Sequence, residues 1–256
     1  MNLTLTPHID VALIVLNAFF LFFLGLVIYL RREDRREGYP LEHELTGRVE
    51  SEGGPLLRAL PKTFRLPFGR GTVSVPNGSR DGFDIAARPA ENFAGAPLVP
   101  TGNPMIDGVG PASFANRAKH PDIDWEGHAR IVPMRVAEGF TIERRDADPR
   151  GYKVVGADGA HAGTVADVWI DRADRLIRYL EVELPGGRHV LAPMFMSSIS
   201  RAKATVTVDA ITAAQFADAP AIEGPDVVTL YEEDRIQGYF GGGYLYATPA
   251  RSEPVL

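Results

Sequence analysis

The chain has 256 residues, of which 45% are hydrophobic and 23% are charged, a composition typical of a folded protein rather than a disordered one. Its 27 basic and 33 acidic residues give a net charge of −6, which argues against nucleic-acid binding. The absence of cysteine excludes disulfides, thiolate metal sites, iron–sulfur ligation and cysteine nucleophiles, while 26 glycines and 20 prolines predict many turns and short elements.

Residues 11–30 form an uncharged apolar run that contains one amide, Asn17. At about 1.5 Å per residue, a helix of this length crosses the roughly 30 Å of hydrocarbon in a bilayer. A helix is required because lipid cannot satisfy exposed backbone polar groups. Tyr29 lies near one end, where an amphipathic ring suits the membrane interface. We therefore predict a transmembrane helix at 11–30.

A cleaved signal peptide is the alternative for this run. Signal peptides carry basic residues before the apolar segment and small residues at a cleavage site. Here no Lys or Arg precedes residue 31, and the run ends in IYLRRED. By the positive-inside rule, the basic residues after the run predict a single-pass protein, with residues 1–10 as a short periplasmic tail and the rest cytoplasmic. These basic residues are Arg31, Arg32, Arg35 and Arg36.

Residues 31–112 are expected to be a charged and then Pro/Gly-rich extended segment. A helical continuation of the span should stop near Gly38, because Pro40 disfavours helix at Tyr39. Residues 31–52 form either a solvated collar near lipid headgroups or a docking segment. Residues 53–112 contain nine Pro and ten Gly and suit a flexible linker. Seven large apolar residues favour instead a segment that packs on partner subunits: Phe64, Leu66, Phe68, Phe83, Ile85, Phe93 and Leu98.

Short strands with alternating apolar residues are predicted from residue 156 onward. A Pro-Gly-Gly turn at 185–187 separates two of them. The predicted strands are 164–170, with Ala166, Val168 and Ile170 on one side; 178–184, with Leu180, Val182 and Leu184 on one side; 188–192; and 204–208, with Val206 and Val208 inward. Such closely spaced strands favour a small antiparallel barrel or sandwich, inside a β-rich cytoplasmic domain at 113–247.

One C-terminal helix is predicted at 226–237, capped by Asp226 and ended by Gly238. The glycines at 241–243 lack the strand-to-helix setting of a phosphate loop, and residues 248–256 form a tail. The expected fold is a membrane-anchored, mostly-β protein. It has one N-terminal transmembrane helix, a small antiparallel β-barrel and one C-terminal helix.

The run DIDWEGH at 122–128 is the most suggestive polar pattern. Asp122, Asp124, Glu126 and His128 recur at every second residue, so an extended backbone would place all four on one face. Such a set could pass protons, or bind a divalent metal at Asp124, Glu126 and His128. A solvated acidic loop is the plainer interpretation. Nucleotide-loop, GxSxG and HExxH motifs are absent from the sequence, so we do not expect an enzyme.

A second charged cluster, DRADRLIR, lies between two predicted strands and contains Asp171, Asp174, Arg175 and Arg178. It could be a turn with surface ion pairs, each contributing about 0–1 kcal/mol. It could equally be a buried ionisable network that conducts charge. The residue types alone do not separate these two interpretations.

Six further motifs occur along the chain: REGYPLE at 36–42, PKTF at 61–64, GRGT at 69–72, TGNPMIDGVGPASF at 101–114, LEVEL at 180–184, and EEDRI with GY at 232–239. In these motifs, and in their order and spacing from the membrane span to residue 247, the chain resembles the H subunit of the photosynthetic reaction centre of purple bacteria. The strands at 156–210 resemble the PRC-barrel module.

The resemblance implies a subunit that binds no cofactor itself and caps the cytoplasmic face of the L and M subunits in the bacterial inner, photosynthetic membrane. Those partners carry bacteriochlorophyll, bacteriopheophytin, quinones and a non-haem iron. The implied role is to stabilise the complex and to conduct protons from the cytoplasm to the reduced secondary quinone. Membrane lipids are further expected partners, and a cytochrome subunit or a light-harvesting antenna in the same complex is left open.

The resemblance also implies which residues carry protons. Asp122, Asp124, Glu126 and His128 correspond to the surface entrance, although a familiar form of the family has a second histidine where Glu126 stands, which weakens tight zinc binding. Asp174 corresponds to a glutamate near the secondary quinone. Arg175 replaces a neutral amide and should favour the ionised form of Asp174. The remaining implied residues are Arg130, Asp171, Arg178 and Glu42.

Two alternatives belong to other functional classes. The chain could be a membrane-tethered PRC-barrel adaptor of another complex, which an absence of L and M genes from the same genome would favour. A metal-dependent hydrolase at 122–128 would require an activity that disappears in an Asp124→Asn variant.

Overall fold

The N-terminal part of the chain is built around one long helix. The computed structural model describes residues 4–6, 9–49, 54, 56–79 and 84–252. Helix α1 (Val11–Glu33) follows two short paired strands, β1 (Thr4–Thr6) and β2 (Ile9–Asp10). The Asp10 carboxylate caps it by accepting the Ala12 N–H at 2.9 Å. Among the described residues, α1 with its next turn is the one segment long and apolar enough to span a membrane.

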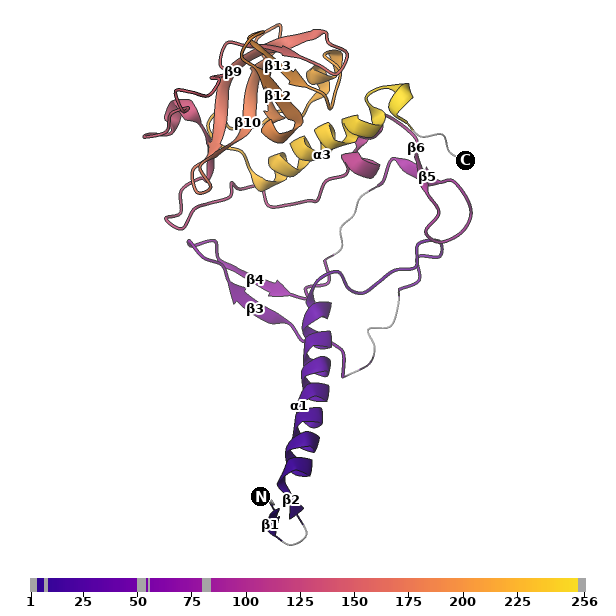
Figure 1. Cartoon of the computed structure of the whole chain (residues 1–256). Helices are drawn as coiled ribbons and strands as arrows, with labels where there is room; N and C mark the ends of the chain where they lie inside the picture. The colour runs from indigo at the N-terminus through magenta and orange to yellow at the C-terminus, as the bar shows by residue number, and fades with distance from the viewer. Residues whose placement is uncertain (1–3, 7–8, 50–53, 55, 80–83, 253–256) are drawn as a thin grey trace. The chain divides into compact units, whose positions relative to one another are not determined.

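Helix α1 ends close to the predicted point. A 3₁₀ turn, Asp34–Arg36, follows it, and the chain changes direction at Gly38, whose φ is +74°. Farther along, β3 (Lys62–Arg65) and β4 (Thr72–Val75) pair as an antiparallel hairpin (Figure 1). These elements belong to the first of two compact units, which comprises residues 1–82 and 91–96.

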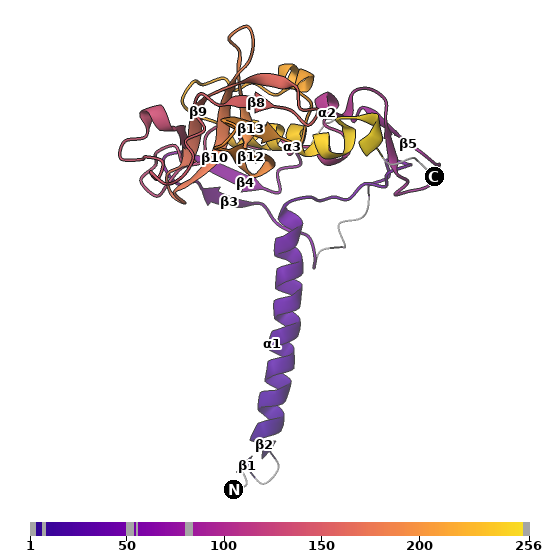
Figure 2. The ribbon, with the colours of Figure 1, turned by 45° about the horizontal axis from the view of Figure 1, so that its top comes forward.

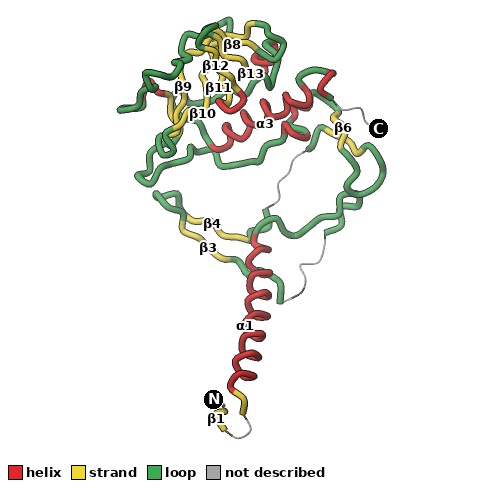
Figure 3. Tube along the Cα trace, viewed as in Figure 1, coloured by secondary structure: helices red, strands yellow, loops and turns green. Residues whose placement is uncertain are grey.

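The second unit, residues 83–90 and 97–256, contains a seven-stranded sheet. Its strand order is β11–β10–β9–β8–β13–β12, and β7 also pairs with β9. Loops occupy much of the chain before the sheet (green in Figure 3). The strands are β5 (Ala87–Pro89) and β6 (Leu98–Pro100), which form a separate hairpin, and β7 (Ile131–Pro133), β8 (Lys153–Val155), β9 (His161–Asp171), β10 (Leu176–Glu183), β11 (His189–Pro193), β12 (Ser197–Ser200) and β13 (Thr205–Val208).

The mostly-β prediction is confirmed, but the sheet is not closed into a barrel. Strands β8 and β13 also run parallel, because the chain passes through β9–β12 before it returns beside β8 (Figure 2). The sheet encloses one apolar core, in which Val154, Val168, Leu180 and Val206 are completely buried. The inward positions predicted at Val206 and Val208 are therefore confirmed.

The alternation predicted for 164–170 is wrong at Ala166, which is exposed. Glu181 pairs with Asp167, and the next residue of β10, Val182, pairs with Val165. Ala166 is thus an extra residue in β9, a β-bulge, and the bulge rather than period-two alternation decides which side chains point inward. A second register shift places Arg178 as the extra residue of β10.

The C-terminal helix differs most from its prediction. Helix α3 spans Leu230–Tyr246, starts at a capping box formed by Thr229 and Glu232, and runs through Gly238 and the glycine triplet. Close packing explains the glycines. A Cβ on Gly238 would lie 2.8 Å from the Ala112 carbonyl oxygen, so this helix face admits only glycine. The predicted cap at Asp226 and end at Gly238 are wrong, because tertiary contacts override the low helix propensity of glycine.

Short helical pieces connect these elements. A 3₁₀ turn, Ala214–Asp218, follows β13. Helix α2 (Pro104–Asp107) and the 3₁₀ turn Gly110–Ala112 lie within the long 101–114 motif and pack against α3. This motif therefore supports the helix that covers part of the sheet.

Candidate functional site

The DIDWEGH run folds as a tight turn and not as the extended backbone that would place all four side chains on one face. The Asp124 N–H donates to the His128 carbonyl at 2.9 Å, and the Gly127 N–H donates to the Asp124 carbonyl at 3.1 Å. One Asp124 carboxylate oxygen accepts the backbone N–H groups of Glu126 at 3.0 Å and His128 at 2.9 Å. An aspartate that hydrogen-bonds its own following backbone is a frequent cause of such turns.

The turn still gathers three of the four predicted side chains. Potential ligand atoms of Asp124, Glu126 and His128 all lie within 4.8 Å of one another. The His128 Nδ1 is 3.5 Å from a Glu126 oxygen and 3.7 Å from an Asp124 oxygen. Two carboxylates and an imidazole at this spacing could hold a divalent transition metal. Asp122 lies outside this group and turns toward Arg130.

The surroundings of Asp124 determine the charge of its carboxyl group. Partial burial raises the pKa of its carboxyl, but the two backbone hydrogen bonds, with His128 and Arg172 nearby, outweigh this and lower the pKa below 3.8 overall. Asp124 therefore remains ionised near neutral pH. The turn therefore places the His128 imidazole, whose ring nitrogens can donate or accept hydrogen bonds, beside a permanent anion.

We define the Arg130 cluster as Arg130 with Asp122, Asp171 and Asp174. The guanidinium donates to Asp171 Oδ1 at 2.9 Å and to Asp122 at 3.5 Å, and it makes a short contact with Asp174. Asp171 ends strand β9 and is 1% exposed. Its burial raises the pKa of its carboxyl, whereas Arg130 and the N–H groups of Ala173 and Asp174 lower it, and the net shift is downward.

The second predicted charged cluster is therefore divided in the structure. Asp171 and Asp174 join Arg130, which comes from the other side of β7 in the sequence. Asp171 is buried, as a conducting network requires, whereas Asp174 has a side chain that is 53% exposed, as a surface ion pair requires. Arg175 is exposed with φ at +55°, and Arg178 is half-buried at the bulge of β10.

A cavity of about 230 Å³ lies beside the Arg130 cluster. Asp122, Arg130 and Asp171 contribute to its wall, and Arg178, Glu233 and Gln237 line it as well. The remaining lining residues are Arg117, Ile131, Leu230 and Asp234. The cavity is large enough for several waters and has polar groups that could hold them.

Glu233 and Tyr179 are the residues of this region that the sequence did not indicate. Glu233 is 7% exposed and accepts a hydrogen bond from the Tyr179 hydroxyl at 3.0 Å, while the Gln237 amide donates to the same hydroxyl at 3.1 Å. Burial raises the pKa of Glu233, and the charge of Asp122 adds to the rise. Burial also raises the pKa of Tyr179, so its hydroxyl remains a donor. The available signal was the pair Glu233 and Gln237, one turn apart on a helix face that meets the sheet.

Glu42 belongs to the first unit and is described apart from these residues. It forms an isolated antiparallel bridge with Val49 and lines a cavity of about 600 Å³ with residues 36–40 and 75–79. Its implied place on a proton path remains a prediction.

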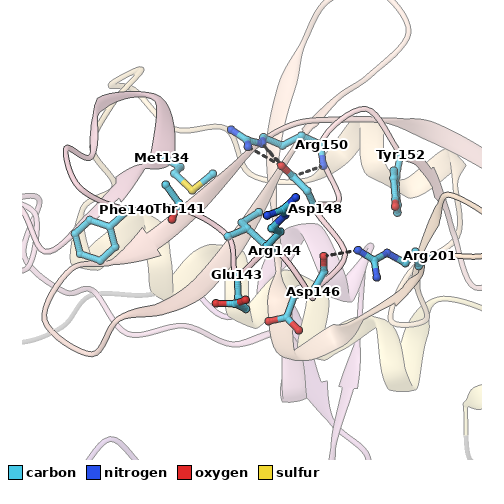
Figure 4. A pocket seen from close by; sticks show the side chains of 11 residues that line it. Met134, Phe140, Thr141, Glu143, Arg144, Asp146, Asp148, Arg150, Tyr152 and Arg201 are labelled. Atoms are coloured by element: carbon cyan, nitrogen blue, oxygen red, sulfur yellow. Dashed lines mark hydrogen bonds and ion pairs between the residues drawn. The ribbon is translucent and has the colours of Figure 1, made fainter.

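Another cavity, of about 550 Å³, lies between the 140–152 segment and Arg201 (Figure 4). Two of its arginines, Arg150 and Arg201, are bound by a carboxylate or by the backbone. Arg150 pairs with Asp148 at 2.6 Å, and this contact holds the pKa of Asp148 below its usual range. Arg201 donates to the carbonyls of Arg145 and Asp146 at 3.1 and 3.0 Å. These contacts fix a loop and do not activate a nucleophile.

The fold and its site define a membrane-anchored protein with a PRC-barrel domain that carries a network of ionisable side chains around a polar cavity. A family model described as "PRC-barrel domain" matches residues 142–215. A second, described as "Photosynthetic reaction centre, H-chain N-terminal region", matches residues 3–136, more than half of the chain. The chain belongs to the photosynthetic reaction centre H-chain family, and this membership implies association with a reaction centre complex.

Proposed function

We propose that this chain caps the cytoplasmic face of the L and M subunits and conducts protons from the cytoplasm toward the secondary quinone. The observation that carries the proposal is the 230 Å³ cavity, which has ionised Asp171 in one part of its wall and Glu233, with its raised pKa, in another. A permanent anion near a carboxyl that titrates closer to neutrality suits proton storage and transfer. Family membership supports association with a reaction centre complex, in which the proposed quinone partner would lie.

The proposed route begins at the 124–128 turn. His128 takes up protons beside ionised Asp124, and the backbone ladder joins this turn to Arg130, whose N–H donates to the Asp122 carbonyl at 2.8 Å. Asp122 and Asp171 then pass protons through water in the cavity, with Glu233 as a reservoir. Asp174, exposed at the edge of the cluster, delivers them to the quinone subunits. Each hop requires groups within hydrogen-bond reach or one water apart.

The topology and composition of the complex belong to the same proposal. The basic residues that follow α1 support a single-pass arrangement with residues 1–10 periplasmic and the second unit cytoplasmic. The chain itself performs no catalysis and holds no pigment; the pigments, quinones and iron reside on L and M. A different complex served by a PRC-barrel adaptor is the competing function, and purification of the tagged chain without pigmented partners would establish it.

The test is the rate of flash-induced second electron transfer to the secondary quinone in the purified complex. An Asp174→Asn variant should slow this step about a hundredfold, at the lower end of the range for loss of a positioned proton-transfer group. The combined Asp124→Asn and His128→Ala change should slow it less, because the open surface offers other proton donors. Primary charge separation should keep its rate in both variants.

Asp148→Asn is the matched control, because Asp148 is also paired with an arginine but lines the other cavity. It should leave the second electron transfer unchanged. Unaltered kinetics in Asp174→Asn across the pH range would remove the Arg130 cluster from the path.

A further inference from the structure

Asn77 and Gly78 form the one Asn-Gly pair in the sequence, and both residues are exposed shortly after the end of β4. Gly78 has φ at +73°, and a Cβ added to it would meet no atom within 4 Å. In such a pair the backbone nitrogen of the glycine can attack the side-chain carbonyl carbon of the asparagine, because no side chain on the second residue obstructs the approach. The reacting groups belong to neighbouring residues, so the reaction is intramolecular and needs no enzyme.

Ser79 holds the Asn77 side chain in a polarised state. The Oδ1 atom of Asn77 accepts the Ser79 backbone N–H at 2.9 Å and the Ser79 hydroxyl at 2.7 Å. Nucleophilic attack at the Asn77 Cγ moves negative charge onto this oxygen. Two donors that already point at the oxygen stabilise that charge, as the donors of an oxyanion hole do. These contacts therefore favour attack at the Asn77 side chain.

A second asparagine makes the same local contact but has a different neighbour. The Oδ1 atom of Asn103 accepts the Met105 N–H at 3.1 Å, which is also a bond to the backbone two residues ahead. Residue 104 is a proline without an N–H, so it cannot make the attack that is open to Gly78. Asn92 and Asn116 are exposed but precede Phe and Arg, whose side chains obstruct the backbone nitrogen. These three asparagines serve as controls within the same chain.

We propose that Asn77 is a site of spontaneous deamidation. The Gly78 nitrogen loses its proton and bonds to the Asn77 Cγ, the bond between Cγ and Nδ2 breaks, and the amide group leaves as ammonia with that proton. Water then opens the resulting five-membered succinimide ring at one of its two carbonyl carbons. The product is aspartate or isoaspartate at position 77. No group is oxidised or reduced, and water is the one co-reactant.

The modification changes the charge of the cavity of about 600 Å³ that Glu42 lines in the first unit. Asn77 contributes to its wall together with Glu37, Glu42 and Arg36. Among the described residues that line this cavity, Arg36 is the one arginine or lysine, and it already pairs with Glu33 at 2.8 Å. A third carboxylate in the wall therefore makes the cavity more negative as the protein ages. This inference does not depend on the proposed proton path.

The test follows each asparagine in the purified membrane complex. Samples are incubated at pH 7 and pH 9, digested at acidic pH to suppress further reaction, and analysed by mass spectrometry of the peptides. An isoaspartate methyltransferase with a radioactive methyl donor reports isoaspartate independently. We expect Asn77 to be modified at least about tenfold faster than Asn92, Asn103 or Asn116, because it alone of the four has an unobstructed attacking nitrogen. The rate should rise with pH, since the Gly78 nitrogen must lose its proton.

Two variants test the residues that the mechanism uses, and an Asn77→Asp chain provides the reference peptide for the aspartate product. Gly78→Ala should slow the reaction at least about tenfold, because a methyl group then obstructs the nitrogen. Ser79→Ala should slow it about threefold to tenfold, as expected for the loss of one hydrogen bond. Asn77 that stays unmodified in the native complex would overturn the proposal, whether or not the urea-unfolded chain is modified there. A Ser79→Ala rate equal to that of the wild-type chain would overturn it too.

Discussion

Two arginines at the two ends of strand β7 build similar ion clusters with different surroundings. Arg130 binds Asp122, Asp171 and Asp174, and Arg135 binds Asp167, Glu181 and Asp226. In each cluster one buried aspartate comes from β9, at positions 167 and 171. The chemistry of the two clusters is therefore nearly the same.

The two clusters differ in the groups that contact their buried carboxylates. Glu181 accepts the Trp169 indole N–H at 2.9 Å, bonds to His189 at 2.7 Å and pairs with Arg135 at 2.7 Å, which leaves it little capacity for other donors. These bonds lower the pKa of Glu181 despite its burial. Asp171, in contrast, lines the cavity shared with Glu233. The comparison teaches that the saturated Arg135 cluster stabilises the fold, whereas the Arg130 cluster borders a polar cavity, as the proposed proton transfer requires.

The largest expected effect is on stability, from the saturated cluster. Arg135→Gln should lower the free energy of unfolding by about 2 kcal/mol, because a charged hydrogen-bond partner of buried Glu181 is lost. Urea denaturation of the chain in detergent measures this change. Arg150→Gln is the control, since its partner Asp148 has a side chain that is 42% exposed and the loss should stay below about 1 kcal/mol. An Arg135→Gln complex that assembles but loses proton delivery would contradict the division between the clusters.

The pH dependence of stability should differ in sign between the two carboxyls that border the cavity. Folding raises the pKa of Glu233 above 4.5, so its contribution to stability is present below that pH and is lost as the pH rises through the folded value. Folding lowers the pKa of Asp171 below 3.8, so its contribution is present above that pH and is lost as the pH falls through the folded value.

Urea titrations between pH 3 and pH 8 test both signs. Relative to the wild-type chain, Glu233→Gln should become more stable as the pH rises, and Asp171→Asn should become more stable as the pH falls. If the free energy of unfolding of the two variants changed in parallel with pH, the pKa values of Glu233 and Asp171 would not be shifted in opposite directions by folding.

Metal binding at the 124–128 turn should strengthen with a second imidazole. Glu126→His should raise the affinity for zinc by at least about tenfold, since imidazole nitrogen is a better zinc ligand than an exposed carboxylate. Competition with a zinc-binding dye measures this. Asp122→His is the control, because Asp122 lies outside the group of ligand atoms and should leave the affinity unchanged. An equal increase in zinc affinity from both substitutions would mean that zinc does not bind specifically at Asp124, Glu126 and His128.

The smallest effect is expected from Asp174→Asn on stability. The Asp174 side chain is 53% exposed and contacts Arg130, so its loss should change the free energy of unfolding by less than about 1 kcal/mol. The same variant is expected to slow the second electron transfer strongly, and this contrast separates a kinetic role from a structural one. A loss of stability comparable to that of Arg135→Gln would make the kinetic result uninformative about proton transfer and would contradict the assignment.

Local patterns predicted much of the fold but not the details of its packing. The apolar run at 11–30 and the inward positions Val206 and Val208 followed from composition and alternation. Ala166 could not be predicted, because a bulge depends on the register with the neighbouring strand. Nor could the passage of α3 through its glycines, which depends on the close approach of residues 110–113.

The sequence predicted many residues of the candidate site but only part of their spatial arrangement. Asp124, Glu126 and His128 do lie together, although in a turn rather than on an extended strand. Asp171 and Asp174 were predicted in one charged cluster with Arg175 and Arg178, yet Arg130 binds them. Glu233 lies 62 positions from Asp171 in the sequence, and no local signal joins the two.

The sequence by itself determined the membrane anchor, the β-rich body and the family, because hydrophobic length, short-range alternation and long motifs are properties of neighbouring residues. Only the tertiary structure decided which arginine binds which carboxylates, and that the Arg130 cluster borders a cavity. The physical reason is that ion pairing, burial and the resulting pKa shifts depend on contacts between residues far apart in the chain, and folding alone brings these together.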